Sequence, residues 1–326
     1  MKLITGKRVL VTGGAGFIGS SVCHDLLERD NEVICLDNFA TGKRENISDL
    51  KESRRFRLIE GDIRDPETCR KAVDGADVVL HQAALGSVPR SIADPATTNA
   101  VNIDGFLNML IASRNAGVKR FVYASSSSVY GDSPELPKVE ERTGKVLSPY
   151  AITKLVNEEY ARVFGSLYEM ETMGLRYFNV FGRRQDPNGP YAAVIPKFTM
   201  AFMKYEAPVI NGDGSNSRDF TYIDNVLLAN NLAATVDNPA AYNQVYNVAC
   251  GDSVTLNEMT SLLKRHLADR DTAVAVVEPV HGPNRPGDIP HSMASIGKAV
   301  RLLGYNPQVL FNEGLRRAVE WYVDNL

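Results

Sequence analysis

The sequence has few of the features that mark disulfide-rich, metal-binding or nucleic-acid-binding proteins. Only 4 of its 326 residues are cysteines, and none forms a Cys-X-X-Cys pair or stands beside a histidine cluster. This spacing indicates neither a disulfide framework nor a zinc site, so we expect no metal. Lys and Arg total 36 against 39 Asp and Glu, a formal charge of −3, so nucleic acid and anionic membranes are not expected partners.

Long apolar runs are also lacking. No run approaches the ~18 residues of a membrane span, and Gly6, Lys7 and Arg8 interrupt any signal-peptide core near the start. Together with the sparse cysteines, this predicts a cytoplasmic protein. The sequence does hold 44% hydrophobic residues, enough for a large core, and its length suggests about two domains.

The first half alternates short apolar runs with segments of helical spacing. This alternation predicts an α/β fold of the Rossmann type, a doubly wound parallel sheet with helices between its strands. Helical spacing is plain at 20–29 and 97–117. The expected strands lie at 8–12, 32–37, 56–62, 76–84, 119–126 and 173–182.

Four glycines, Gly13, Gly14, Gly16 and Gly19, occupy the first strand-to-helix turn. Glycine permits a tight turn there and lets backbone N–H groups approach a pyrophosphate at a helix N-terminus. Asp37 ends the second strand, at the spacing expected for a carboxylate on the adenosine ribose. We interpret this pattern as a dinucleotide site rather than as close helix packing alone.

Asp37 also favours NAD over NADP, since a carboxylate there accepts from a free 2′-hydroxyl and repels a 2′-phosphate. Lys43 and Arg44 lie near enough in the sequence to keep NADP as an alternative, although solvated loop charges explain them as well. Asp62, after the third strand, is expected to accept from the adenine amino group. The alternative for Asp62 is an exposed turn aspartate.

Four consecutive serines, 125–128, end the fifth strand, at the carboxyl edge where ligands bind in such sheets. Hydroxyls there either cap the strand end or face a sugar. The segment LSPYAITK follows, in which Ser148 is expected to cap a helix that begins at Pro149. Tyr150 and Lys154 then share one helix face, either as a catalytic pair or as a tyrosine beside a solvated lysine.

Together with TGGAGFIG and the serine at the strand end, this pair resembles the extended short-chain dehydrogenase/reductase family along nearly the whole chain. Within that family the sequence is similar to UDP-hexose 4-epimerases, particularly those acting on N-acetylated sugars in bacterial polysaccharide pathways. The segments that carry this similarity are DNFATGKREN, HQAALGSVPRS, SSSSVYGD, SPYAITK, LRYFNVFGRRQDPNG, SRDFTYIDN and RPGD. The resemblance implies an isomerase with tightly retained NAD, which oxidises C4, lets the 4-keto sugar rotate and returns the hydride to its other face.

The resemblance also implies roles for the residues at the catalytic site. Tyr150, as phenolate, takes the O4 proton. Lys154 and the nicotinamide charge are expected to lower the pKa of this tyrosine from ~10 toward the operating pH, and Lys154 also holds the nicotinamide ribose. Ser126 hydrogen-bonds O4 and relays its proton, whereas Ser127 and Ser128 contact the substrate.

A set of binding residues follows from the same resemblance. The cofactor contacts are Gly13, Gly16, Phe17, Ile18, Gly19, Asp37, Asn38, Gly42, Asp62, Ile63, Gln82, Ala83, Ala84, Asn102, Tyr150, Lys154 and Tyr177. The substrate contacts are Gly86, Ser87, Ser126, Ser127, Ser128, Tyr150, Asn179, Ala193, Val194, Lys197, Asn211, Arg218, Arg285, Asp288 and Ser292. Arg218 and Arg285 are expected on the diphosphate and Asp288 on the uridine ribose, although either arginine alone is typical of a surface charge.

Ser292 bears on the size of the sugar. The family has either tyrosine or a small residue at this position beside C2, and a small residue leaves room for an N-acetyl group. Serine here, with Gly86, Ser87 and Arg90 in ALGSVPRS, favours UDP-GlcNAc and UDP-GalNAc or their C6-oxidised uronic acids. Plain UDP-Glc and UDP-GlcA are the remaining alternatives, and Arg90 faces either a C6 carboxylate or solvent.

The resemblance further implies how the chain divides and assembles. An NAD-binding domain is expected at 1–182, with 219–252 returning to it, and a smaller α/β UDP-sugar-binding domain at 183–218 and 253–326. Residues 99–114 and the helix that carries Tyr150 resemble the two helices that pair across a homodimer as a four-helix bundle.

Other functions of the same scaffold fit the serine segment less well. A 4,6-dehydratase needs an Asp-Glu pair where this chain has Ser127 and Ser128, and the sugar decarboxylases usually show a glutamate there. A non-catalytic NAD-sensing protein is the alternative of a different class. Such proteins typically lose the tyrosine or the lysine, and Tyr150 and Lys154 are both present.

Overall fold

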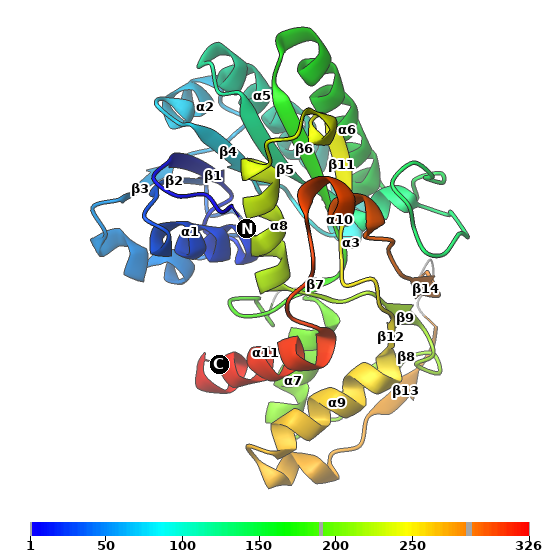
Figure 1. Cartoon of the computed structure of the whole chain (residues 1–326). Coiled ribbons are helices and arrows are strands. Elements are labelled where there is room, and N and C mark those ends of the chain that lie inside the picture. The colour runs from blue at the N-terminus through cyan, green and yellow to red at the C-terminus, as the bar shows by residue number, and fades with distance from the viewer. Residues whose placement is uncertain (1, 189–191, 285–288, 326) are drawn as a thin grey trace.

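The computed structural model describes residues 2–188, 192–284 and 289–325 and has a seven-stranded sheet at its centre (Figure 1). The strand order is β11-β6-β5-β4-β1-β2-β3, and every neighbouring pair is parallel. The strands are β1 (Arg8–Thr12), β2 (Glu32–Asp37), β3 (Phe56–Glu60), β4 (Val78–His81), β5 (Arg120–Ser126), β6 (Glu171–Tyr177) and β11 (Gln244–Val248). The Rossmann-type parallel sheet predicted from the sequence is confirmed.

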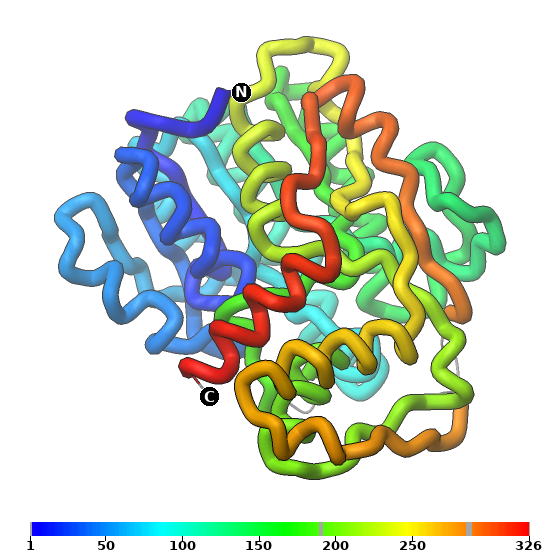
Figure 2. The backbone as a smooth tube through the Cα atoms, turned by 60° about the horizontal axis from the view of Figure 1, so that its bottom comes forward, coloured from blue at the N-terminus to red at the C-terminus, as the bar shows by residue number. Residues whose placement is uncertain are grey.

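Helices cover both faces of this sheet. One face carries α1 (Phe17–Glu28) and α8 (Ile223–Thr235), and the other carries α2 (Pro66–Val73), α5 (Gly105–Asn115) and α6 (Pro149–Tyr168) (Figures 1 and 2). Val9 and Val11 of β1 lie in the core under α1, whereas Leu10 lies in the core under α5. Successive strand residues point to opposite faces, so a strand buried on both sides is apolar throughout.

The helix expected over 97–117 is present but is not regular. It follows α3 (Val88–Ala93) and consists of α4 (Pro95–Asn99), the π-helical turn η3 (Ala100–Asp104) and α5 in direct succession. π-helical turns are rare and are frequent at functional sites. This one carries Asn102 beneath the loop that follows β4.

A smaller region lies below the sheet in Figure 1. Its helices α7 (Val194–Met203), α9 (Leu256–Ala268) and α11 (Phe311–Asn325) pack on one another, while α10 (Gly297–Leu303) packs beside β11. Its small sheets pair β7 (Val180–Phe181) with β10 (Thr221–Tyr222), β8 (Val209–Asn211) with β13 (Val280–Gly282), and β9 (Ser217–Arg218) with both β12 (Val254–Thr255) and β14 (His291–Ser292). Short 3-10 turns are η1 (Arg44–Ile47), η2 (Asp49–Glu52), η4 (Ser127–Tyr130), η5 (Pro239–Ala241) and η6 (Thr272–Val276).

The chain crosses between the two regions more than once. Both α8 and β11 fall within 219–252 and belong to the layers of the central sheet, whereas β9 and β14 lie in the smaller region. The domain boundaries expected from the sequence remain a prediction. Within the described residues, no helix is long and apolar enough to cross a membrane, and no cluster of three His, Cys, Asp or Glu side chains could hold a metal ion.

Candidate active site

The turn between β1 and α1 is built from glycines because the neighbouring backbone leaves no room for side chains. Gly13 has a φ of +66°, and a Cβ there would lie 2.7 Å from the Cα of Ala83. A Cβ on Gly19 would lie 2.0 Å from the carbonyl oxygen of Gly13. Gly16 is the N-cap of α1 and supplies no side-chain cap, so the N–H groups of the first turn are left for an anion.

This turn borders a cleft of ≈ 520 Å³ at the carboxyl ends of the first four strands. Gly86, Ser87 and Arg90 line the cleft on the side of α3. Twelve predicted cofactor contacts line it as well: Gly13, Gly16, Phe17, Ile18, Gly19, Asp37, Asn38, Asp62, Ile63, Gln82, Ala83 and Ala84. Their contacts with a cofactor remain predictions, but the fold brings them to one place.

Asp37 is fixed at the end of β2 by two backbone donors. Its Oδ2 accepts from the N–H of Ala15 at 2.9 Å and its Oδ1 from the N–H of Phe39 at 2.8 Å. Burial raises the pKa of Asp37, and the two backbone N–H groups act in the opposite direction. Each oxygen has a further lone pair, so the carboxylate can still accept from ribose hydroxyls.

The two cations that kept NADP as an alternative are both paired. Lys43 forms a 3.0 Å ion pair with Asp186, and Arg44 forms a 2.7 Å ion pair with Glu60. The guanidinium of Arg44 also lies 4.0 Å above the ring of Phe39. These contacts account for both charges without a 2′-phosphate and agree with NAD.

Asp62 lines the cleft and is already held by other polar groups. Arg64 contacts it at 2.7 Å, and the amide of Asn38 donates to it at 2.8 Å. Chiefly through the hydrogen bonds from Arg64, the pKa of Asp62 falls to about 2, so the group is a carboxylate at neutral pH. An adenine amino group that donates to Asp62, as predicted, would share the carboxylate oxygens with Arg64 and Asn38.

Asn102 is a predicted cofactor contact that does not line the cleft. Its amide nitrogen donates to the carbonyl of Leu85 at 3.2 Å and to Oγ1 of Thr153 at 3.1 Å, and its Oδ1 accepts from the N–H of Leu85 at 2.7 Å. Both donors are therefore used within the protein. Asn102 ties the loop after β4 to α6, and these hydrogen bonds do not support a direct cofactor contact.

Tyr177 and Gly42 are predicted cofactor contacts that are also not among the residues lining the cleft. The Tyr177 hydroxyl donates to Oε1 of Gln82 at 3.1 Å and accepts from Asn230 at 2.9 Å, while Gln82 donates to Asn230 at 3.0 Å. This closed triangle orients the Gln82 amide, which does line the cleft. A Cβ on Gly42 would lie 2.9 Å from Oδ1 of Asp37, so glycine there leaves space for that carboxylate.

The helix α6 begins as the sequence predicts. It starts at Pro149, and the Ser148 hydroxyl accepts from the N–H of Ala151 at 3.1 Å. Lys154 is buried and donates from Nζ to the carbonyl of Ala124 at 2.7 Å, and this Nζ lies 6.0 Å from the ring centre of Tyr150. The lysine is therefore part of the protein interior, which rules out the solvated pair considered from the sequence.

Burial dominates the electrostatics of the pair. It lowers the pKa of Lys154 to about 8, against the opposing effect of Glu158. It raises the pKa of Tyr150, while the Ser126 side chain acts in the opposite direction. The sequence predicts a lowered pKa for Tyr150, but the protein by itself raises this pKa because desolvation of the phenolate outweighs the effect of its neighbours. A lowered pKa for Tyr150 is therefore expected only with the positive charge of a bound nicotinamide.

The serine segment shows the capping role considered from the sequence. The Ser126 hydroxyl caps the turn η4 by accepting from the N–H of Ser128 at 3.2 Å, and Ser125 donates to Glu158. The Ser128 hydroxyl is buried and has no hydrogen-bond partner among the described residues. Buried polar groups are rarely left unpaired, so this hydroxyl is a candidate contact for a bound sugar.

Among the predicted substrate contacts, Arg218 and Ser292 are brought together. They face each other in the register of the parallel strands β9 and β14, and Nη1 of Arg218 donates to the carbonyls of Ser217 at 2.8 Å and Pro290 at 3.2 Å. Ala193, Val194 and Lys197 gather at the start of α7, Asn179 follows β6 and Asn211 ends β8. Arg285 and Asp288 lie outside the described residues.

Several residues that line the cleft were not predicted. Thr97 and Val101 reach it from α4 and η3, and Asp186 and Ala192 reach it from the segment after β7. Helical periodicity does not tell which face of α4 meets the cleft. The position of Asp186 depends on its long-range pairing with Lys43, which leaves no local signal.

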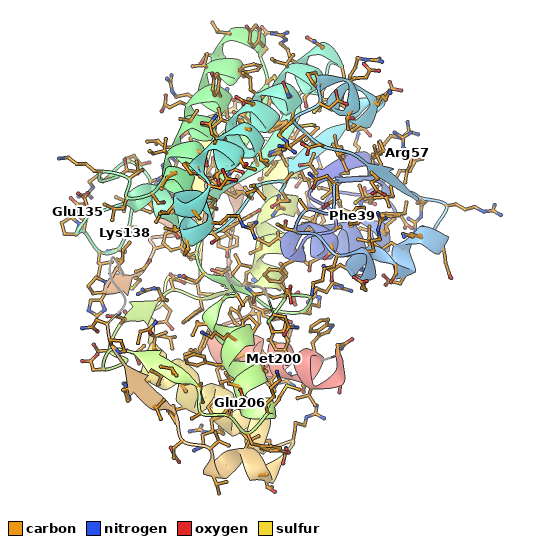
Figure 3. All side chains as sticks on the ribbon, turned by 180° about the vertical axis from the view of Figure 1, so that it is seen from behind. Phe39, Arg57, Glu135, Lys138, Met200 and Glu206 are labelled. Atoms are coloured by element: carbon orange, nitrogen blue, oxygen red, sulfur yellow. The ribbon has the colours of Figure 1, made fainter. Side chains whose placement is uncertain are left out.

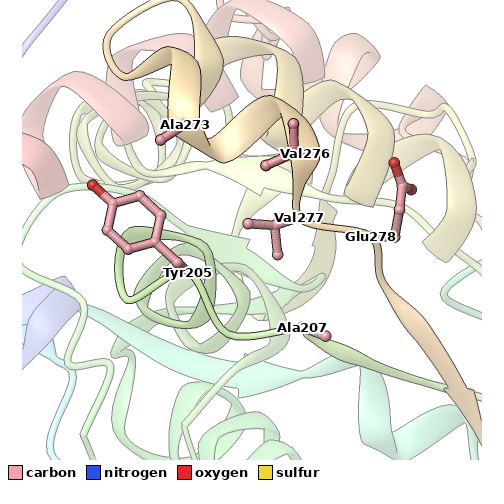
Figure 4. A pocket seen from close by; sticks show the side chains of 6 residues that line it. All are labelled: Tyr205, Ala207, Ala273, Val276, Val277 and Glu278. Atoms are coloured by element: carbon pink, nitrogen blue, oxygen red, sulfur yellow. The ribbon is translucent and has the colours of Figure 1, made fainter.

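A second cavity of ≈ 480 Å³ lies at the far end of the smaller region (Figure 4). The residues lining it are Tyr205, Ala207, Ala273, Val276, Val277 and Glu278. None of the predicted site residues is among them, and the Tyr205 hydroxyl donates to Asp271 at 2.7 Å. Figure 3 shows Met200 and Glu206 in this same region, away from Phe39 near the cleft. The cavity is therefore separate from the candidate active site.

Comparison with known proteins places the chain in a family. Residues 9–249 match the model of the NAD dependent epimerase/dehydratase family. UDP-glucose 4-epimerase of Mycolicibacterium smegmatis is 36% identical over 97% of this chain and 98% of its own length. A UDP-N-acetylglucosamine 4-epimerase from Methanobrevibacter ruminantium, solved with UDP-N-acetylmuramic acid, is 40% identical with a TM-score of 0.92, over 99% of this chain and 100% of the other.

A structure of Thermus thermophilus UDP-glucose 4-epimerase with NAD is 36% identical with a TM-score of 0.85, over 98% of this chain and 100% of the other. These three relatives are UDP-sugar 4-epimerases, as the resemblance of the motifs predicts. The matched span runs from β1 to the residue after β11 and so includes the cleft and α6. This chain belongs to the NAD-dependent epimerase/dehydratase family, which confirms the predicted cofactor and enzyme class.

Proposed function

We propose that this protein is a 4-epimerase of UDP-N-acetylhexosamines, which interconverts UDP-GlcNAc and UDP-GalNAc with tightly bound NAD. The observation that carries the proposal is the position of Tyr150 and Lys154 on one face of α6, beside Ser126 at the end of β5. Asn102 ties α6 to the loop that borders the dinucleotide cleft. The pair and the cleft therefore form one site.

NAD bound in this cleft would supply the hydride acceptor and donor for C4 of the sugar. The glycine turn, which a Cβ would fill, and the two free lone pairs of Asp37 fit the pyrophosphate and the ribose. Tyr150 removes the proton from O4 and later returns it, and Ser126 hydrogen-bonds the same oxygen. The ammonium of Lys154 favours the phenolate, since an opposite charge stabilises the ionised form.

The preference for an N-acetylated sugar rests on Ser292. This small residue lies next to Arg218 in the register of β9 and β14, so an arginine suited to a diphosphate and a small side chain occur together. The similarity to a UDP-N-acetylglucosamine 4-epimerase supports the same substrate. The unpaired hydroxyl of Ser128 supplies a further polar contact for the sugar.

A second substrate is favoured by one observation. Arg90 lines the cleft beside Gly86 and Ser87, where a guanidinium could pair with a carboxylate at C6. A structure of UDP-glucuronic acid 4-epimerase from Bacillus cereus, 29% identical to this chain, is also similar. The C6-oxidised form of the N-acetylated sugar is therefore the second candidate substrate.

A homodimer through α5 and α6 is part of the proposal. These helices lie side by side on the face shown in Figure 3. The exposed large apolar residues of α6 are Ile152, Val163, Leu167 and Tyr168. Leu107 and Ile111 of α5 are partly buried. Pairing two copies into a four-helix bundle would remove this apolar surface from water.

We also propose a two-domain division, a cytoplasmic location and a role in polysaccharide synthesis. The two-domain division at 182, 219 and 252 is supported by the separate layers described above. A cytoplasmic location is supported by four free cysteines. A role in polysaccharide synthesis rests on the sequence resemblance.

The test is a 4-epimerisation assay of the purified protein without added NAD. The substrates are UDP-GlcNAc, UDP-GlcNAc uronic acid, UDP-Glc and UDP-GlcA, separated by chromatography or NMR. Turnover of one N-acetylated sugar well above its plain counterpart supports the proposal and distinguishes the two candidates. Equal or faster turnover of the plain sugars contradicts the role of Ser292, and no turnover even with NAD added contradicts the proposed function.

A further inference from the structure

Three side chains on α6, each one turn apart, meet residues 124–126 at the end of β5. Tyr150 interacts with the serine that ends this segment. Lys154 donates to its first carbonyl at 2.7 Å, and Glu158 accepts from its middle hydroxyl at 2.5 Å. The first two side chains have roles in the proposed reaction, whereas Glu158 has none so far.

Glu158 is held by a buried arginine. It is 7% exposed, and Arg176 of β6, 3% exposed, contacts both of its oxygens at 2.9 and 2.8 Å. The remaining guanidinium nitrogen of Arg176 donates to the carbonyl of Glu140 at 3.0 Å. Desolvation offsets most of the attraction in such a pair, so fold stability alone gives little reason for two charges here.

Glu158 lies one turn after Lys154 on α6, and its negative charge acts to raise the pKa of Lys154. Lys154 lies near the ring of Tyr150 on its own helix, and its charge interacts with Glu158 on that helix and with His81 on β4. Burial lowers the pKa of His81 to about 3, so this ring is neutral near pH 7. The positive charge of Arg176 on β6 is balanced by Glu158 itself. Among the described residues, Glu158 is the carboxylate that opposes the effect of burial on Lys154.

We propose that Glu158 is a positioning residue for the epimerase reaction: held by Arg176 and Ser125, it fixes α6 against the end of β5 and holds a negative charge one helical turn from Lys154. The inference rests on the proposed function, because the charge on Lys154 matters only if Tyr150 acts as the base. In this proposal Glu158 contacts neither the cofactor nor the sugar.

Two holoenzyme variants separate charge from position. Glu158→Gln keeps the length of the side chain and removes its charge, whereas Glu158→Asp keeps the charge and withdraws the carboxylate by one methylene. In Glu158→Gln, the alkaline fall of kcat should move to lower pH by roughly 1 unit. In Glu158→Asp, that fall should stay in place while kcat drops roughly 10-fold from misplacement of α6. KM should change little in both.

The matched control is Glu171→Gln. Glu171 pairs with Arg120 at 2.8 Å, at the other end of the same strands β5 and β6. Its variant should leave the pH dependence of kcat in place. An unmoved alkaline fall in Glu158→Gln, or an equal movement in Glu171→Gln, would overturn the proposal.

Two further variants test the proposal if the Glu158 variants do not fold and separate it from the proposed function. If the Glu158 variants do not fold, Ser125→Ala removes only the hydroxyl donor and should lower kcat several-fold, and an unchanged kcat there overturns the positioning role. Tyr150→Phe is measured in parallel. Full turnover in Tyr150→Phe overturns the proposed function and this inference with it. Lost turnover there, with an unmoved alkaline fall in Glu158→Gln, overturns the role of Glu158 alone.

Discussion

The ammonium of Lys154 donates to the carbonyl oxygen of Ala124 over 2.7 Å, where β5 passes into the serine segment. This hydrogen bond holds α6 against the end of the strand, and Tyr150 lies one turn earlier on the same helix. The lysine therefore has both a charge and a mechanical contact at the site. A change at position 154 affects both.

Replacing Tyr150 by phenylalanine should lower epimerase turnover by roughly 10²–10⁴-fold or more, because general base catalysis by the phenolate is lost. NAD should stay bound, since the rest of the cleft is unchanged. Turnover and the cofactor content of the purified protein are the measurements. Tyr205→Phe, on the remote cavity, is the control and should keep full activity. Full activity in the Tyr150 variant would show that another group is the base.

Turnover of the holoenzyme should fall as pH rises through about 8, because burial lowers the pKa of Lys154 to about 8 and the amine then loses its proton. A Lys154→Arg variant with residual activity should lack this fall, since arginine keeps its charge. Between about pH 8 and 10.5 the folded state binds fewer protons at this group than the unfolded state, so its contribution raises the free energy of unfolding with pH. A rate that stays level to about pH 10 would contradict the shift.

NAD should restore activity to protein stripped of cofactor, and NADP should not, because the Asp37 carboxylate repels a 2′-phosphate. Asp37→Asn should narrow the difference between the two cofactors. Lys43→Ala is the control: Lys43 pairs with Asp186, so its loss should leave the preference unchanged. Equal rescue of the parent protein by both cofactors would refute the assignment of Asp37.

Replacing Ser292 by tyrosine should lower kcat/KM for UDP-GlcNAc by roughly 10²-fold, because the ring would occupy space proposed for the acetamido group. The same variant should keep its rate with UDP-Glc, which serves as the internal control. Steady-state kinetics with both sugars measure the ratio. A parallel loss with both substrates would indicate general damage to β14 instead.

Leu167→Glu should convert the proposed dimer into a monomer, because it places a charge on the apolar surface of α6 that is proposed to form the interface. Leu167 is 66% exposed in the single chain. Light scattering at micromolar concentration measures the mass. Val276→Glu alters an 82% exposed valine on the remote cavity and should leave the mass unchanged. A parent protein that is already a monomer would remove the dimer from the proposal.

The features predicted well from the sequence have local causes. The start of α6 follows from the cap at Ser148 and the ring of Pro149, and both act within one turn. Features that depend on packing were either not predicted or predicted with the opposite direction of change. Asn102, which forms hydrogen bonds with Leu85, lies on a π-helical turn. The pKa of Tyr150 is raised by burial between elements distant in the sequence. Neither leaves a pattern in the residues nearby.

The position of β11 has a consequence for how the chain is made. This strand lies at the edge of the sheet beside β6, yet the smaller region's α7 is synthesised between them. Until residue 248 has left the ribosome, β6 presents an open strand edge, which is a site for pairing with other nascent chains. The sheet of the dinucleotide-binding half is therefore complete only when β11 has been synthesised. Until then, the open edge of β6 has to be kept from pairing with other chains.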